Sequence, residues 1–210
     1  MPDSVARFVA DLARERPPGN LFNQYAIEVP GLDRPGGAAT RCDNLRAYLE
    51  PRIGVRLALI GEAPSAHGAR FSGIAFTAER SLPPSRRTSA DGLTKDGFAE
   101  HSATVLRGAM EAAGMDPASV VLWNAMPFHP ARADDPLRNR RPTAEELALG
   151  RRWLDRFLVL LQPGLVVGLG QSSRRVLPAG TLVLRHPANG GKPGLQAGLM
   201  GLALEFGLRR

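Results

Sequence analysis

Four short runs of the chain are apolar at consecutive positions and rich in β-branched residues, a pattern that predicts buried strands. They cover residues 55–60, 120–124, 165–169 and 181–185. Strands with apolar side chains on both alternating faces are typical of a parallel sheet that is covered on both sides. We therefore expect these four runs to form a central parallel sheet.

Amphipathic patterns with helical spacing lie around these runs. The clearest spans residues 143–161, where Thr143 and Glu146 fit a capping box ahead of an apolar stripe. Gly114 is placed to end another predicted helix as its C′ residue. The predicted helices are 4–16, 41–50, 97–113, 143–161, 172–177 and 195–206. Strands that alternate with helices indicate an α/β fold with right-handed crossovers and helices on both faces of the sheet.

The length of 210 residues suits one domain over residues 1–210. Within it, residues 1–40 are predicted to form a helical and loop extension that packs on the rest, since residues 19–40 are rich in Gly, Pro and Asn. The chain has no run of 18 apolar residues and its first segment carries scattered charges, so we expect no membrane span and no signal peptide. The expected location is the bacterial cytoplasm or nucleoid.

The formal net charge of +7 favours a polyanionic partner such as nucleic acid. However, lysine occurs only at Lys95 and Lys192 among 27 basic residues, and such a skew toward arginine fits genomic base composition equally well. Cys42 is the single cysteine, and the four histidines lack HExxH-type spacing. We therefore expect no metal site, no iron–sulfur cluster and no disulfide within the chain.

Two motifs directly follow predicted strands, where ligands of open parallel sheets bind. In Gly61-Glu62-Ala63-Pro64, Gly61 lets the backbone approach a ligand closely, and Glu62 can orient a water molecule or stabilise a cation. In Arg185-His186-Pro187-Ala188, His186 can donate a hydrogen bond to an oxygen that gains charge. The alternatives are a Glu62 that caps a helix or pairs with an arginine, and a His186 that is satisfied by the backbone.

Two further residues are suited to recognise a planar ligand. Phe76 lies on an irregular segment and can stack on a nucleobase, or it can be a core residue under the loop. Asn124 ends a strand, and its amide presents a donor and an acceptor that match the imide edge of uracil, or it caps its own turn. Two Pro- and Arg-rich loops, 78–95 and 129–142, are expected to rim the same face of the molecule as the pocket.

Four segments taken together resemble the uracil-DNA glycosylase superfamily in order, spacing and strand placement. They are GEAPSAHGARFSGIAFTAE at 61–79, LWNAMPFHP at 122–130, VVGLGQSSRRVL at 166–177 and LRHPANGGKPGLQAGL at 184–199. The resemblance implies a three-layer αβα sandwich on a four-stranded parallel sheet. It also implies a monofunctional DNA glycosylase of base excision repair, which flips uracil or a related deaminated base out of DNA and hydrolyses its N-glycosidic bond without a cofactor.

The resemblance gives each matching residue a role. Glu62 and His186 are expected to be catalytic, while Gly61, Ala63, Phe76 and Asn124 are expected to bind the base. Contacts with the DNA backbone are predicted for Ser65, Arg70, Asn189, Gly190 and Lys192. The expected partner is single- or double-stranded DNA with a damaged base, bound by a monomer.

The chain departs from the family pattern at three places. Ala63 stands where the best-known branch has Asp, and the branch with Glu at the position of Glu62 carries four cysteines around an iron–sulfur cluster. No large apolar wedge follows Pro187. The alternative function is therefore a catalytically weak or inactive nucleic-acid-binding member of the same fold. An unrelated nucleotide-binding enzyme is disfavoured, because the chain has neither a GxxxxGKS/T loop nor a GxGxxG fingerprint.

Overall fold

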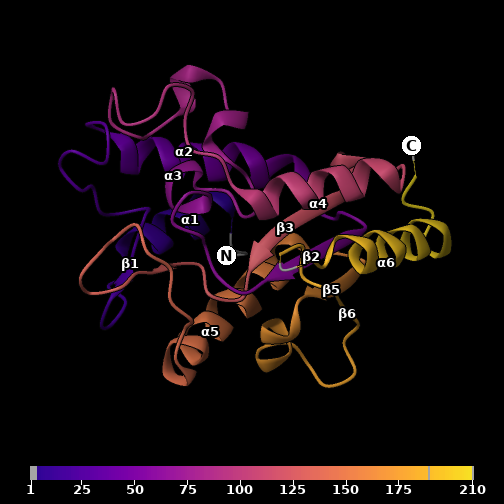
Figure 1. Cartoon of the computed structure of the whole chain (residues 1–210). Coiled ribbons are helices and arrows are strands. Elements are labelled where there is room, and N and C mark those ends of the chain that lie inside the picture. The colour runs from indigo at the N-terminus through magenta and orange to yellow at the C-terminus, as the bar shows by residue number, and fades with distance from the viewer. Residues whose placement is uncertain (1–3, 189, 210) are drawn as a thin grey trace.

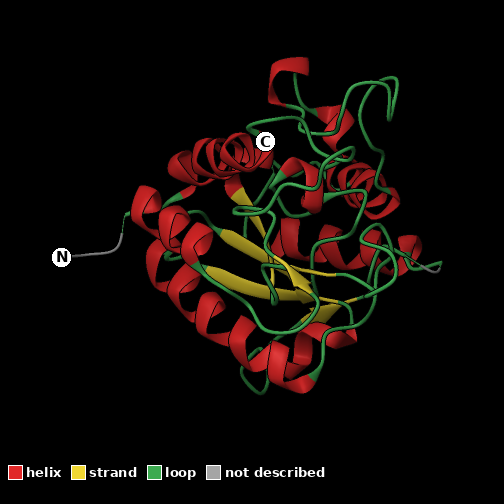
Figure 2. Ribbon diagram, turned by 90° about the vertical axis from the view of Figure 1, so that its left-hand side faces the viewer, coloured by secondary structure: helices red, strands yellow, loops and turns green. Residues whose placement is uncertain are grey.

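A four-stranded parallel sheet in the order β3-β2-β5-β6 forms the centre of the molecule (Figures 1 and 2). The computed structural model describes residues 4–188 and 190–209. The strands are β2 (Leu57–Gly61), β3 (Val120–Asn124), β5 (Leu165–Leu169) and β6 (Val183–Leu184). All four predicted runs are therefore in the sheet, although the last pairs over only two residues.

Helices cover both faces of this sheet, which makes the predicted three layers (Figure 2). In β2, Ala58 and Ile60 point into one core and Leu57 and Leu59 into the other. The first core lies against α1 (Val5–Arg14), α2 (Gly37–Leu49) and α5 (Ala144–Leu161), and the second against α4 (His101–Ala112) and α6 (Lys192–Glu205). A strand buried on both faces accounts for the unbroken apolar runs of the sequence.

Local signals predicted some helix ends and missed others. The capping box of α5 is present, with Thr143 and Glu146 hydrogen-bonded to each other's backbone N–H groups. By contrast, α2 begins at Gly37, four residues before the predicted start at 41. The reason is that Glu28 accepts hydrogen bonds from the N–H groups of Gly36 and Ala38 and so caps this helix from a distance.

The N-terminal segment is integral to the core. Phe8 of α1 is fully buried, and its ring lies 5.7 Å from the rings of both Trp123 and Trp153. Residues 19–40, which are mostly loop as predicted, contain the two-residue strand β1 (Leu21–Phe22), which pairs with β4 (His129–Pro130). The remaining short elements are α3 (Ala69–Ser72), η1 (Glu50–Arg52), η2 (Glu79–Ser81), η3 (Pro84–Arg86), η4 (Pro117–Ser119) and η5 (Gln171–Arg175).

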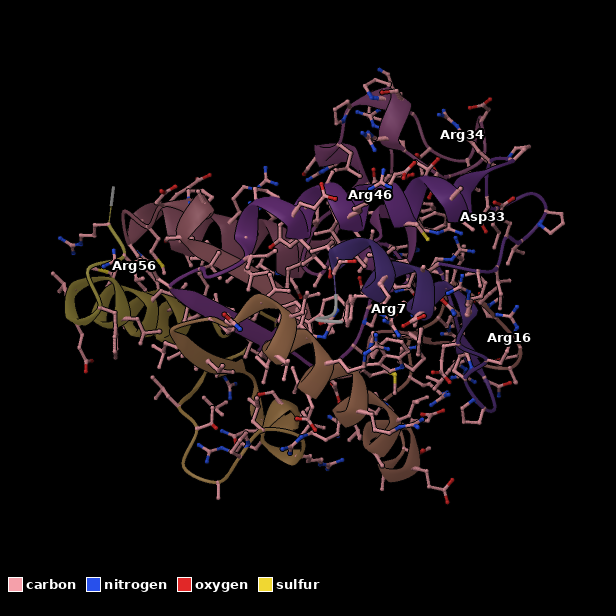
Figure 3. The ribbon with its side chains drawn as sticks, turned by 180° about the vertical axis from the view of Figure 1, so that it is seen from behind. Arg7, Arg16, Asp33, Arg34, Arg46 and Arg56 are labelled. Atoms are coloured by element: carbon pink, nitrogen blue, oxygen red, sulfur yellow. The ribbon has the colours of Figure 1, made fainter. Side chains whose placement is uncertain are left out.

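Among the described residues, no helix combines the length and the apolar composition that a membrane span requires. Figure 3 shows Arg7, Arg16, Arg34, Arg46 and Arg56 spread over the face that it views. The net charge alone therefore does not mark a binding site.

Candidate active site

The two central strands end side by side and place Asn124 beside the turn that contains Glu62. Gly61 of β2 is opposite Asn124 of β3 in the parallel register. The pairing continues past both strand ends, because the N–H of Ala125 donates to the carbonyl of Gly61 at 2.8 Å and that of Met126 to the carbonyl of Glu62 at 2.9 Å. Asn124, at 5% exposure, is therefore fixed at the carboxyl edge of the sheet.

The Phe76 ring lies against the backbone of Gly61. A Cβ atom at position 61 would fall 2.4 and 2.5 Å from two ring carbons and 2.8 Å from Oδ1 of Asn124. Glycine is therefore needed here so that both side chains can approach the strand end. Phe76 has a φ of +50°, and holding a non-glycine residue in this left-handed region costs about 1–3 kcal/mol. Strain of this kind is typical of functional sites, and here it directs the ring toward the site.

His186 is held as a neutral imidazole with its proton on Nε2. The backbone N–H of Ala188 donates to its Nδ1 at 3.1 Å, which fixes this tautomer. Burial lowers the pKa of His186, and Arg185 lowers it further, whereas the nearby Glu62 carboxylate acts in the opposite direction. The ring centroid lies 6.3 Å from that of Phe76. His186 therefore offers a neutral N–H donor near the aromatic ring.

Glu62, Phe76, Asn124 and His186 all line one cavity of about 190 Å³. Their positions in the sequence span more than a hundred residues, but the parallel sheet brings them to one edge. Ala63 lines the same cavity through its methyl group. The structure thus brings together the four side chains to which the sequence assigned chemistry.

A second hollow of about 430 Å³ adjoins this cavity and shares Glu62 and His186 with it. Its other polar lining includes the side chains of Arg141, Ser172 and Arg185. Arg141 and Arg185 are exposed. The two hollows meet at Glu62 and His186. We call the second one the basic hollow, because its exposed arginines can contact a polyanion.

The residues predicted to contact the DNA backbone fall into different environments. Lys192 is exposed at the first position of α6, and Gly190 is exposed with a φ of +72°. Asn189 lies outside the described residues. Contacts of Gly190 and Lys192 with phosphate remain a prediction.

Arg70 cannot contact DNA, and that prediction was wrong. Its side chain is fully buried, donates to both carboxylate oxygens of Asp33, and stacks on the rings of Phe22 and Phe71. Arg41 donates to the same carboxylate at 2.8 Å. Burial alone would raise the pKa of Asp33, but the hydrogen bonds and charges of the two arginines hold it below its usual range. Arg70 therefore stabilises the scaffold rather than a ligand.

Ser65 was also expected at the DNA backbone, but the residue lines the cavity and its Oγ is buried beside Gly68. Next to it lies Glu100, a cavity residue that the sequence analysis did not identify, together with Ser102, Asn139 and Arg140. The sequence analysis placed Glu100 within a helix predicted over 97–113, whereas α4 begins at His101, so no sequence signal pointed to Glu100 as a cavity residue.

The two long loops behave differently. Asn139 and Arg140 of the 129–142 loop line the cavity, and Asn139 Oδ1 accepts a hydrogen bond from the N–H of Ala66 at 2.7 Å. No described residue of the 78–95 loop lines it. This loop folds back on itself, because the buried Glu79 carboxylate accepts hydrogen bonds from the N–H groups of Thr88 and Ser89.

The described residues contain no group of three or more His, Cys, Asp or Glu side chains that could hold a metal ion.

Comparison with known proteins agrees with this geometry. The family model of the uracil DNA glycosylase superfamily matches residues 49–195. No curated protein matches the chain. Among solved structures, that of wild-type SMUG2 from Pedobacter heparinus is similar, with a TM-score of 0.61, 14% sequence identity and 96% of each chain covered. At this identity the structural similarity shows a common fold.

Proposed function

The chain belongs to the uracil DNA glycosylase superfamily, and from this we propose that it removes uracil, or a related deaminated base, from DNA by hydrolysing the N-glycosidic bond. The observation that carries the proposal is that Glu62, Phe76, Asn124 and His186 line one cavity at the carboxyl edge of the sheet. This combines an aromatic face, an amide edge, a neutral donor and a carboxylate, which are the groups that base excision requires.

The base must leave the DNA stack before it can enter such a cavity, at a cost of a few kcal/mol. Stacking on an aromatic ring contributes about 1–3 kcal/mol per base, so Phe76 offsets part of that cost. Asn124 then accepts a hydrogen bond from N3–H of uracil and donates one to O4. Cytosine presents the opposite pattern of donor and acceptor, so the amide selects the deaminated base.

When the glycosidic bond breaks, its electron pair goes to the base and negative charge develops on O2. The Nε2–H of neutral His186 is suited to donate to that oxygen. The sugar becomes cationic at C1′, and the oxygen of water forms the new bond there. Glu62 meets His186 at the junction of the two hollows, and we assign to it the positioning of this water and the stabilisation of the sugar cation.

The basic hollow beside the cavity suits the sugar–phosphate backbone. Arg141 and Arg185 provide charge for phosphate contacts that carry no sequence information. Since Glu62 and His186 line both hollows, a nucleotide with its phosphates in the basic hollow would have its glycosidic bond beside these two residues.

The test is incubation of the protein with labelled oligonucleotides that carry one uracil, followed by alkali and gel analysis. We expect strand scission at the uracil with single- or double-stranded substrate, and none with thymine at the same position. A His186→Ala variant should be slower by about a hundredfold or more. Absence of scission with uracil, hypoxanthine and xanthine at micromolar protein would overturn the proposal.

One observation favours a second function, a binding protein of the same fold without turnover. Ala63 contributes only a methyl group to the cavity, where the best-known branch of the family has an acid. Uracil-specific binding that weakens with salt, without release of the base, would support this alternative.

A further inference from the structure

Glu100 is a carboxylic acid in the cavity that the reaction described above does not use. Its Oε2 is buried and has no hydrogen-bond partner among the described residues. Although it occupies the N-cap position of α4, its side chain does not cap that helix. Buried polar atoms are normally hydrogen-bonded, so an orphaned carboxyl oxygen beside a ligand cavity calls for an explanation.

The position of Glu100 is held by the surrounding structure. The ring of Phe98, two residues earlier, stacks between those of His67 and Phe71, with centroids 4.9 and 4.4 Å away. This stacking brings the start of α4 against the turn at Gly68. A Cβ at Gly68 would fall 1.9 Å from Oε2 of Glu100 and 2.6 Å from Oγ of Ser65. The absence of a side chain at 68 thus leaves the space that these two groups occupy.

Glu100 and Ser65 line the base cavity but not the basic hollow, whereas Glu62 and His186 line both. A nucleotide with its sugar at this junction would place the base in the cavity. The edge of the base that is far from the sugar would then face Glu100 and Ser65. In uracil, the polar group at that far edge is the O4 carbonyl, which replaces the amino group of cytosine on deamination.

The surroundings favour a protonated carboxyl group at this place. Burial raises the pKa of Glu100, and the Ser65 hydroxyl, which lies near the carboxyl group but outside hydrogen-bonding geometry, acts in the opposite direction. The other ionisable side chains that line the cavity are Glu62, Arg140 and His186. Of these, Arg140 forms a bidentate ion pair with Glu146, in which its two terminal nitrogens lie 2.7 and 2.6 Å from the carboxylate oxygens. None of the three forms an ion pair with Glu100 in the described part of the chain.

We propose that Glu100 donates a hydrogen bond from its carboxyl group to the carbonyl oxygen at the far edge of the flipped base. A carbonyl oxygen has two lone pairs, so it can accept from Glu100 and from the Asn124 amide at once. Glu100 is then a second determinant of selectivity for deaminated bases. This inference rests on the proposed function, because it assumes that the cavity receives a base.

The test measures binding without turnover. The probe is an oligonucleotide with one 2′-fluoro-2′-deoxyuridine, whose fluorine destabilises the sugar cation and so blocks hydrolysis, and the reference is the same strand with thymidine. Wild type is compared with Glu100→Gln, which keeps a donor but cannot ionise, and with Glu100→Ala, which has none. Glu111→Gln on the exposed side of α4 is the matched control. Thermal melting establishes that each variant is folded.

At acidic pH, where Glu100 is protonated, we expect Glu100→Ala to weaken uracil-specific binding about fivefold to tenfold, the effect of one hydrogen bond, while Glu100→Gln and Glu111→Gln bind as wild type. The affinity of wild type relative to Glu100→Gln should fall as pH rises, because only the wild-type side chain ionises. Gly68→Ala, which displaces the carboxyl group without removing it, should reproduce the loss.

Two results would overturn the inference: equal losses in Glu100→Gln and Glu100→Ala, or wild-type binding by Glu100→Ala. Its failure is distinct from that of the proposed function. A wild type that releases uracil but is insensitive to Glu100→Ala keeps the function and removes the inference. A wild type that binds the fluorinated probe with the expected variant pattern, yet releases no uracil, keeps the inference and leaves a binding protein.

Discussion

At the scale of single residues, the site depends on how closely side chains approach the strand ends. Asn124 and Phe76 both pack over Gly61, and a methyl group there would collide with each of them. Asn124 is only 5% exposed and lines the cavity, so a base that enters the cavity desolvates its amide. A desolvated amide discriminates strongly, since a wrong partner leaves a buried polar group unpaired.

Replacement of Asn124 by Asp tests this recognition. The carboxylate loses the donor to O4 and repels the oxygens of the uracil edge, so release of uracil should fall by about a hundredfold. Single-turnover kinetics on a uracil oligonucleotide measures the change. Asn20→Asp, at an exposed position, adds the same charge and should have little effect. An unchanged rate in Asn124→Asp would assign this residue a structural role.

At the scale of elements, a cluster of buried charged side chains stabilises the turn that follows β2. Arg70 of α3 and Arg41 of α2 share the Asp33 carboxylate, and all three side chains are inaccessible to solvent. Removing one partner of such a cluster leaves an uncompensated buried charge, which typically costs about 3–5 kcal/mol. The stability of the turn after β2 therefore depends on residues that never meet a ligand.

Two arginine variants distinguish a residue that stabilises the fold from a residue that contacts DNA. Arg70→Ala should lower the free energy of unfolding by about 3–5 kcal/mol and leave the salt dependence of DNA binding unchanged. Arg141→Ala, at an exposed position beside the basic hollow, should leave stability nearly unchanged and reduce the slope of log K against log salt by about 1. Urea unfolding and anisotropy titrations at several salt concentrations measure both. The reverse pattern would show that Arg70 contacts DNA.

Most of the fold could be predicted from the sequence because its signals are local. Apolar runs marked the four strands, and the capping box marked the start of α5. The predictions that failed concern residues whose surroundings depend on contacts between distant segments. Arg70 is buried because it meets Asp33, 37 positions earlier, and Glu100 enters the site only because Phe98 stacks on His67 and Phe71. Neither the burial of Arg70 nor the position of Glu100 can be recognised from neighbouring residues in the sequence.

At the scale of the whole molecule, the buried His129 and the half-buried His186 link stability to pH. The ring nitrogens of His129 contact the carbonyl oxygens of Pro64 and Pro136 at 2.9 and 3.2 Å, and so link the turn after β2 to the 129–142 loop. Burial lowers its pKa, although these carbonyls act in the opposite direction. The pKa of His186 is also lowered, chiefly by burial. Below the unfolded value near 6.5, the unfolded chain therefore binds more protons than the folded one, which destabilises the fold.

We expect the free energy of unfolding to decrease as pH falls from about 7 to 5. His129→Gln should reduce this dependence, because it removes one of the two histidines whose pKa is lowered. His67→Gln, at an exposed position, should retain the dependence of wild type. Denaturant titrations at several pH values provide the measurement. A wild-type stability that rises on acidification over this range would contradict the assignment of both histidines as neutral.

The central claim is that one cavity accepts a base turned out of DNA. A crystal structure of the protein with a duplex containing 2′-fluoro-2′-deoxyuridine tests it most directly. The account predicts the uracil ring against Phe76, its imide edge at Asn124 and its O2 beside Nε2 of His186. A uracil that stays stacked in the duplex, or that binds outside this cavity, would contradict it.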